Sequence, residues 1–290
     1  MNLLSKSGLS LERLRTFLAF AEAGSIVRAS ANDPVRASLI SRQLRELEEF
    51  FEVELVKRHG KGLVLTDEGM RLAALVREQF LSLEEFRKTA TGKSIRLTLG
   101  AGNTMLEWVV VPRIKPGLIA SVEFDLHHEQ SNESIEGLRN GSRDLAIIQK
   151  KPLSRQFASA SLGSVSFALF IPKRLGRQTN LRKALRELPL ALPIGGSLRE
   201  AILQYAGEIN AANLGTTGFH NAVALVRAGH YAAVLPSIAT VNIGPDISMS
   251  PIPPSVVQTR QIVLAWSKRA ATTRPAIALA IEKLREVLVF

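Results

Sequence analysis

The N-terminal part of the chain carries apolar residues at helical spacing, separated by short polar breaks. Ser10 is a suitable N-cap, and the apolar residues after it form one face of a helix that Gly24 ends. Ser25 can cap a short second helix over about 26–31, which Asn32-Asp33-Pro34 breaks. A third periodic run has one apolar face, formed by Ile40, Leu44, Leu47 and Phe51. The pattern therefore predicts three short helices.

The opposite face of the third predicted helix is polar and basic and carries Ser38, Ser41, Arg42 and Arg45. Such a face is often no more than the solvent-exposed side of a helix. Three short helices with a tight turn before the third, however, predict a helix-turn-helix. Serine and arginine near the start of its last helix are groups that reach phosphates and base edges in a major groove. We therefore expect these four side chains to contact double-stranded DNA.

A β-hairpin is predicted directly after the third helix. Two short β runs, 55–58 and 63–65, flank the turn His59-Gly60-Lys61-Gly62. The hairpin is basic through Lys57, Arg58 and Lys61. A basic hairpin beside a recognition helix can act as a wing that grips the DNA backbone or the minor groove.

One long helix, about 67–89, follows the hairpin. Thr66 is its predicted N-cap, and two acidic residues suit its positive N-terminal end. A continuous apolar stripe runs along it, formed by Leu72, Leu75, Val76, Phe80, Leu83 and Phe86. The stripe can pack on its own domain or pair with a second copy of the chain. We expect pairing, because the stripe is long and no compact domain lies beside it in the sequence.

Beyond a polar hinge at 90–94, strand and helix patterns alternate to the end of the chain. The predicted strands are 95–100, 122–128, 144–148, 165–171, 190–194, 215–219, 232–235 and 261–266. One predicted helix reaches from the first strand to about 119, and the others cover 133–140, 180–188, 198–209, 222–228 and 275–288. This alternation predicts a mixed α/β fold in two lobes, with helices covering both faces of the sheets. A cleft between two such lobes suits a small ligand.

The net charge does not follow the predicted DNA-binding segment. The 290-residue chain has a formal net charge of +11, which favours polyanionic or acidic partners. Residues 1–93 contain 15 basic and 13 acidic residues, whereas residues 94–290 contain 22 and 13. Most of the excess positive charge thus belongs to the α/β part of the chain.

Other features of composition bound the location of the protein. The sequence has no cysteine, which excludes disulfides and thiolate metal sites. Its apolar runs are all shorter than the roughly 18 residues of a membrane helix. Residues 1–8 are too polar for a secretory signal. We expect a cytoplasmic protein that does not enter a membrane.

Several short motifs, taken together, resemble those of the LysR-type transcriptional regulators. In the N-terminal part they are Leu14–Phe17, Ala23–Ser25, Arg28–Ser30, Ser41–Arg45 with Leu47-Glu48, and Leu65–Gly69, in the family's order and spacing. A weaker similarity continues at Leu138–Gly141, Asp144–Ile147, Val226–Gly229 and Val234–Pro236. The resemblance implies a winged helix-turn-helix, a linker helix that dimerises, and an effector domain like a periplasmic binding protein, with its ligand between two lobes.

Two positions depart from the family pattern. The family usually has a glutamine where this chain has Ala37, and a leucine where it has Asp33, which is followed here by Pro34. The family's turn geometry and first base contact therefore do not carry over to this chain. Arg36 or Ser38 is our substitute candidate for that contact.

Candidate effector-binding residues lie where predicted strands pass into helices. Backbone N–H groups at helix N-termini suit anions, although glycines there can also serve only to make tight turns. Since the resemblance places a ligand at this position, the candidates are Gly102, Asn103, Thr104, Gly196 and Ser197, with Gln149, His220 and Asn221 as weaker ones. The basic charge of this region favours a small carboxylate or another anion. Alternatively, that charge lies on the surface and serves solubility or a second stretch of DNA.

Enzyme motifs are incomplete. The Gly100-x-Gly102 run lacks the third glycine of a dinucleotide fingerprint, although Glu123 follows at a suitable distance. The sequence has neither HExxH nor GxSxG, and His127 and His128 would point to opposite faces of one strand. We therefore predict no catalytic residues, no metal and no cofactor. The alternatives are a solute-binding or transport component with a fused helical domain, and an architectural DNA-binding protein without a ligand.

The predicted organisation has three parts. Residues 1–66 form the winged helix-turn-helix, 67–93 the linker helix and hinge, and 94–290 the effector domain. The predicted partners are double-stranded DNA, a small-molecule effector, and further copies of the chain in a homodimer or homotetramer. RNA polymerase is a further candidate partner.

Overall fold

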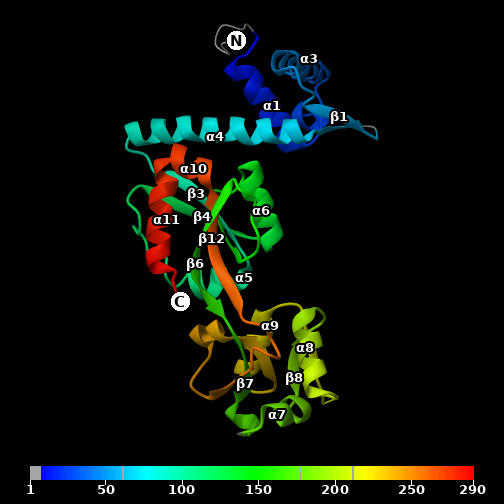
Figure 1. Ribbon diagram of the computed structural model, residues 1–290, viewed down its shortest axis with the longest axis vertical. Coiled ribbons are helices and arrows are strands. Elements are labelled where there is room, and N and C mark those ends of the chain that lie inside the picture. The colour runs from blue at the N-terminus through cyan, green and yellow to red at the C-terminus, as the bar shows by residue number, and fades with distance from the viewer. Residues whose placement is uncertain (1–7, 61, 177, 211) are drawn as a thin grey trace.

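The computed structural model describes residues 8–60, 62–176, 178–210 and 212–290 (Figure 1). A small helical unit lies on one side of the long helix α4 (Asp67–Ala90), and a first α/β lobe lies on the other. A second α/β lobe lies beyond the first, at the far end of the molecule from α4. The mixed α/β fold with two lobes is confirmed.

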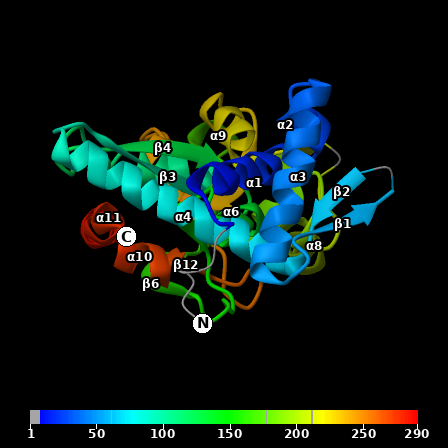
Figure 2. The same ribbon diagram turned by 90° about the horizontal axis from the view of Figure 1, so that it is seen from above.

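The N-terminal unit consists of α1 (Leu11–Ala23), α2 (Ile26–Ala29), α3 (Pro34–Phe51) and a hairpin of β1 (Val56–His59) and β2 (Gly62–Leu65). The hairpin projects beside α3, as seen from above in Figure 2. Three N-caps predicted from the sequence form: the side chains of Ser10, Ser25 and Thr66 each accept an N–H from the first turn of their helices. Gly24 ends α1 with φ 67°, in the left-handed region that glycine adopts without strain. Helix α2 is shorter than predicted and ends at Ala29.

Asp33 and Pro34 together start helix α3. The Asp33 carboxylate accepts the N–H groups of Val35 and Arg36, at 2.9 and 3.3 Å. Pro34 occupies the first turn, where a missing N–H costs nothing. Of the predicted apolar face, Ile40, Leu44 and Leu47 are buried, but the last buried position is Phe50 rather than Phe51, which is only partly covered. Phe51 packs against the edge of the core.

The sheet of the first lobe has the strand order β4-β3-β5-β12-β6. Strands β3, β4 and β5 are parallel, and β12 runs antiparallel to both of its neighbours. These strands are Ile95–Ala101 (β3), Val122–His128 (β4), Leu145–Gln149 (β5), Phe157–Val165 (β6) and Arg260–Ser267 (β12). Helix α6 (Ser131–Asn140) packs on one face of the sheet. The C-terminal helices α10 (Lys268–Thr273) and α11 (Pro275–Val287) pack against the larger core on the other face.

The second lobe has a five-stranded sheet in the order β11-β7-β10-β8-β9, with an apolar cluster on each face. Its strands are Phe167–Pro172 (β7), Leu190–Pro193 (β8), Leu214–Thr216 (β9), Ala232–Pro236 (β10) and Ile247–Pro251 (β11). Its helices are Lys173–Leu175 (η3), Leu181–Glu187 (α7), Ser197–Ala206 (α8), Phe219–Arg227 (α9) and Ser237–Asn242 (η4). The chain enters this lobe after β6 and returns to the first lobe in β12.

Two sequence predictions in the α/β part are wrong. The strand predicted over 165–171 is two strands, since β6 ends at Val165 in the first lobe and β7 starts at Phe167 in the second. Most of β6 was missed because its serine, alanine and glycine residues carry little β-propensity. The helix predicted to reach 119 stops early: α5 (Asn103–Met105) continues into the π-helix η2 (Leu106–Val110), and Pro112 then prevents further helix. Strand β11 and helix α10 were also missed.

Candidate nucleic-acid interface and effector site

The predicted DNA-contacting face of α3 is largely open to solvent. Ser38 and Arg45 on this face are exposed, and Arg36 is exposed in the first turn of the helix. Ser41 is partly buried, and its hydroxyl donates to the Ala37 carbonyl at 3.0 Å, so that its donor is engaged within the helix. The Ser41 oxygen is therefore a weaker candidate for a DNA contact than the three exposed side chains.

Arg42 is exposed but oriented by its own helix. Its side chain is 68% exposed, and its Nε lies 3.6 Å from Glu46 Oε1. Glu46 also forms an ion pair with Arg13 of α1 at 2.7 Å. This acidic residue therefore connects the two helices and limits the positions of Arg42. An exposed pair of this kind is weak, so a phosphate or a base edge can compete for the guanidinium.

The basic residues of the hairpin do not share one face. Lys57 and Arg58 are both exposed and lie opposite Val64 and Leu63 in the hairpin register. Because successive side chains of a strand point to opposite faces, these two point away from each other. Lys61 lies outside the described residues. Only one of the Lys57 and Arg58 side chains can therefore lie on the same side as the N-terminal end of α3.

Asn103 and His220 meet across the two lobes. Asn103 follows β3 in the first lobe, and His220 lies in the first turn of α9 in the second. The Asn103 Nδ2 contacts His220 Nε2, and His220 Nδ1 lies 3.3 Å from Glu107 Oε2. Sequence reasoning missed Glu107, because an acidic residue inside a helical run carries no signal of its own. These three side chains form a polar bridge at the facing edges of the lobes.

Trp108 anchors one lobe in the other. It belongs to η2 of the first lobe, yet it is 1% exposed and packs in the core of the second lobe with Val223 and Val226. Its ring lies edge-on to His220, with 6.3 Å between centroids. The neighbouring Val109 and Val110 pack in the core of the first lobe. Adjacent side chains of this π-helix, a feature often found at functional sites, thus enter two different cores.

The remaining candidates lie at the carboxyl ends of strands that face the other lobe. Gly102 and Thr104 are partly buried after β3, and Gln149 is exposed at the end of β5. After β8, Gly196 and Ser197 are exposed, and Asn221 is exposed beside His220 in α9. Carboxyl ends of parallel strands are the usual place for ligands in open α/β sheets.

Comparisons with known proteins agree with this architecture. The model of the LysR substrate-binding domain matches residues 90–289, and that of the bacterial regulatory helix-turn-helix proteins of the lysR family matches residues 11–70. The chain belongs to the LysR family. It is a LysR-type transcriptional regulator with a DNA-binding helix-turn-helix and an effector-binding domain, and not an enzyme. The resemblance inferred from the short motifs is confirmed.

Its relatives are distant in sequence but match over most of their length. A probable hydrogen peroxide-inducible genes activator from Streptomyces viridosporus is 27% identical over 249 residues, covering 79% of this chain and 78% of the relative. The regulator IlvY from Escherichia coli is 24% identical over 297 residues, covering 97% and 96%. Among solved structures, a full-length OxyR variant from Pseudomonas aeruginosa is 21% identical, covers 98% of this chain and 95% of its own, and has a TM-score of 0.64. The OxyR structure supports the fold over nearly the whole length of the LysR-type chain.

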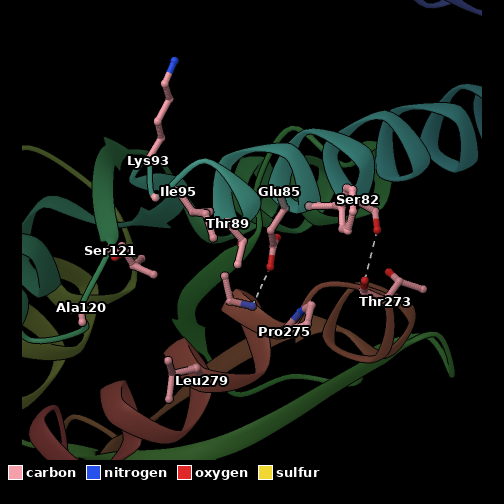
Figure 3. A pocket seen from close by; sticks show the side chains of 14 residues that line it. Ser82, Glu85, Thr89, Lys93, Ile95, Ala120, Ser121, Thr273, Pro275 and Leu279 are labelled. Carbon is pink, nitrogen blue, oxygen red and sulfur yellow. Dashed lines mark hydrogen bonds between the residues drawn. The ribbon is translucent and has the colours of Figure 1, made fainter.

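The apolar stripe on the linker helix α4 of this LysR-type regulator is divided. Leu72 and Val76 are buried in the core of the helix-turn-helix unit, whereas Leu83 and Phe86 are 57% and 74% exposed. Beside the exposed half lies a pocket of about 520 Å³, shown in Figure 3, between α4, the start of α11 and the edge formed by β3 and β4. Its wall is mainly apolar and includes Phe86 and Leu279.

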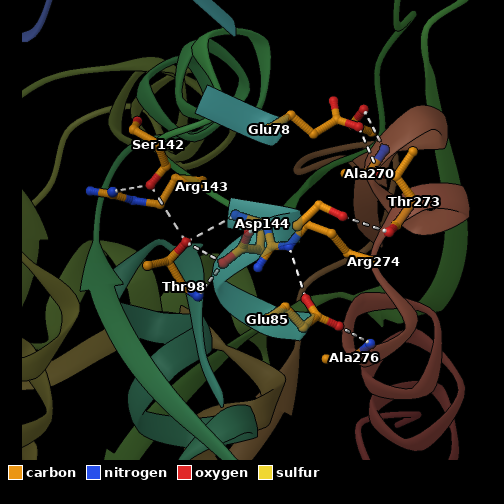
Figure 4. A network of polar contacts seen from close by, with 12 residues as sticks. Glu78, Glu85, Thr98, Ser142, Arg143, Asp144, Ala270, Thr273, Arg274 and Ala276 are labelled. Atoms are coloured by element: carbon orange, nitrogen blue, oxygen red, sulfur yellow. Dashed lines mark hydrogen bonds and ion pairs between the residues drawn. The ribbon is translucent and has the colours of Figure 1, made fainter. Parts of the chain in front are cut away.

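A buried ion-pair network joins α4 to the first lobe (Figure 4). Arg274, which is 3% exposed, donates from Nε to Glu85 of α4 at 3.1 Å and also pairs with Asp144. The second Glu85 oxygen accepts the Ala276 N–H at 2.7 Å and so caps α11. Asp144 accepts the backbone N–H of Thr98 at 2.7 Å and its hydroxyl at 2.9 Å. The carboxylates and the guanidinium are thus satisfied by one another and by neighbouring N–H and O–H groups.

The structure describes no helix that is both long and apolar enough to cross a membrane. Within the same residues, no cluster of three or more histidine, aspartate or glutamate side chains is arranged to hold a metal ion.

Proposed function

We propose that α3 is the recognition helix and reads operator DNA through Arg36, Ser38, Arg42 and Arg45. The observation that carries this proposal is the exposed basic face of α3 inside a helix-turn-helix that matches the lysR family. The first turn of α3 presents Arg36 because Asp33 and Pro34 fix its start. The hairpin would lie beside the backbone, with one of Lys57 and Arg58 on a phosphate.

The test is binding of the purified protein to the DNA flanking its own gene, measured by fluorescence anisotropy over a series of salt concentrations. For Arg42→Ala and Arg45→Ala, loss of a base contact should cost about 1–3 kcal/mol, whereas loss of a phosphate contact should mainly lower the salt slope. Arg186→Ala, on an exposed face of α7 in the second lobe, is the matched control. If both α3 variants bind like the wild type, α3 is not the recognition helix.

The exposed half of α4 is the proposed contact between two copies of the chain. Leu83 and Phe86 are largely open to water, and Phe86 also lines the neighbouring pocket. Contiguous exposed apolar side chains of this size commonly mark protein interfaces. A two-fold axis through this region would place two recognition helices on neighbouring half-sites of the operator. A homodimer follows, and two such dimers would make the expected homotetramer.

The proposed effector is a small molecule, with a carboxylate as the favoured class, held between the lobes. The Asn103–His220 bridge would line its site, with the Thr104 and Ser197 hydroxyls as further hydrogen-bonding groups. The support is the placement of all four at facing strand ends, in a domain that matches the LysR substrate-binding model. Binding there would shift the lobes relative to each other and alter the position of the dimer on DNA. Such a regulator would act in the cytoplasm, where its operator is.

A thermal-shift screen of metabolites tests the effector proposal, because a ligand that binds only the folded protein raises its apparent stability. Thr104→Val and Ser197→Ala should each reduce the shift that a hit causes. Ser248→Ala is a control in the same domain, since Ser248 lies on β11 and donates to the Ile171 carbonyl. A protein that no metabolite stabilises would instead fit an architectural DNA-binding role.

A further inference from the structure

Arg260 lies where the chain returns from the second lobe to the first. It is the first residue of β12 and pairs in register with Val165, the last residue of β6. Strand β7 of the second lobe begins two residues after Val165, at Phe167. Both connections between the lobes therefore pass beside Arg260.

The surroundings of Arg260 are apolar and remove part of its water. Its guanidinium carbon lies 5.1 Å from the centre of the Phe167 ring, in a cation–π arrangement. Burial lowers the pKa of the Arg260 guanidinium, whereas nearby acids raise the pKa values of the arginines at positions 87 and 96. The local environment thus penalises the positive charge instead of compensating it.

Arg260 differs from the other covered arginines of the described residues. Those that are buried or partly buried besides Arg260 each have a hydrogen bond or an ion pair: Arg13, Arg77, Arg113, Arg143, Arg199 and Arg274. No acid and no hydrogen-bond acceptor lies within bonding distance of the Arg260 side chain among the described residues. A covered charge without a partner is unfavourable, which makes an external anion the natural partner.

The position of Arg260 connects it to the bridge between the lobes. The Phe167 ring lies 6.3 Å from the ring of Phe219, the residue before His220. Gln149 pairs in register with Ile262, two residues along β12 from Arg260, so that these three side chains point to the same face of the sheet. Arg260 therefore lies on the side of the sheet and at the strand ends where the effector candidates gather.

We propose that Arg260 binds the carboxylate of the effector. The planar guanidinium, held on the Phe167 ring, can donate two parallel N–H groups to the two oxygens of one carboxylate. This inference rests on the proposed binding of a small carboxylate between the lobes and adds the residue that selects it. Neutral compounds of the same shape would leave the guanidinium unpaired and would bind more weakly.

The experiment uses isothermal titration calorimetry on the full-length protein, with a panel of small mono- and dicarboxylates, each beside its primary amide. The wild type should bind at least one acid and should bind its amide much more weakly. Arg260→Gln should weaken binding of that acid about 10- to 100-fold, as expected for loss of charge-assisted hydrogen bonds. Arg260→Lys keeps the charge and loses the paired geometry. Its affinity for the acid should lie between those of the wild type and Arg260→Gln. Arg186→Gln should bind like the wild type.

Each outcome decides something. If the wild type binds acids and amides equally, or if Arg260→Gln binds the acid as the wild type does, the carboxylate anchor is wrong and the small-molecule site stands. If no acid or amide of the panel binds, the anchor is wrong, and the thermal-shift screen then decides separately whether any effector exists. Thermal unfolding of each variant checks the fold, and Arg260→Lys keeps the test valid if Arg260→Gln does not fold.

Discussion

The two halves of helix α4 share one secondary structure but bury different kinds of side chain. The first half buries Leu72 and Val76 in the helix-turn-helix core. The second half exposes Leu83 and Phe86, and its most buried side chain is a charged one, Glu85, at 6% exposure. The regular spacing of apolar residues along a helix thus shows which side chains share a face. It does not show what covers that face.

Between the two halves, Arg77 contacts both neighbouring domains. Its guanidinium lies 2.9 Å from Glu22 of α1 and also donates to the Asn140 carbonyl at the end of α6. The linker helix is therefore attached to the DNA-binding unit by an apolar core, to the first lobe by buried charges, and to both by one arginine. Substitutions along α4 should separate these three kinds of attachment.

The largest expected loss of stability comes from a substitution in the buried ion-pair network of Arg274. Arg274→Ala would leave Glu85 and Asp144 buried without their cation, and breaking such a network costs about 3–5 kcal/mol of the free energy of unfolding. Urea denaturation followed by circular dichroism measures this loss. Arg285→Ala, at an exposed position of α11, should change stability by less than about 0.5 kcal/mol. A loss below about 1 kcal/mol for Arg274→Ala would show that the network adds little to the attachment.

A somewhat smaller loss of the free energy of unfolding is expected for a substitution in the first half of α4, whose buried side chains are apolar. Leu72→Ala removes a buried side chain, which costs about 2–3 kcal/mol, at the lower end of such substitutions because Leu72 is 7% exposed. Proteolysis of the N-terminal unit should become faster while the α/β lobes stay resistant. The control is Met70→Ala on the same helix, where the side chain is 50% exposed. Equal effects of the two substitutions would contradict the assigned core.

A substitution in the middle of α4 should lower the free energy of unfolding by less. Arg77→Ala removes one partly exposed ion pair and one hydrogen bond to a carbonyl, together about 1 kcal/mol. The consequence of interest is greater freedom between the two domains, which hydrogen exchange at the ends of α1 and α6 would report. Unchanged exchange in both regions would mean that Arg77 does not couple them.

The smallest effect on folding, and the largest on assembly, is expected at the exposed half. Leu83→Ser with Phe86→Ser should leave the unfolding of a single chain within about 0.5 kcal/mol of the wild type, because both side chains already face water. Sedimentation velocity should show smaller species, and cooperative DNA binding should be lost. Leu214→Ser, a partly exposed apolar position in the second lobe, serves as the control. An unchanged oligomer would place the dimer contact elsewhere.

Local features of the fold were predictable, and long-range ones were not. The caps Ser10, Ser25 and Thr66 follow from short-range chemistry that a sequence displays directly. The Arg274 network joins groups that are 130 and 189 residues apart, and no periodicity connects them. In the candidate site, Asn103 and His220 were predicted from their positions after strands. Glu107 and Arg260 were missed, since a charged residue in a helix or at the start of a strand usually faces solvent.

The burial of Trp108 in the opposite lobe limits how this regulator can respond. A tryptophan contributes roughly 150–250 Å² of buried surface, so that pulling the lobes fully apart would cost about 4–6 kcal/mol for this side chain alone. An effector that bound only such an open state would have to overcome this cost. Its affinity would be at least about a thousandfold weaker than its contacts with the open state alone would give. The lobes should therefore twist about the indole as a pivot and stay in contact throughout. The signal that reaches the DNA would then be a small rotation, transmitted through a molecule that never opens.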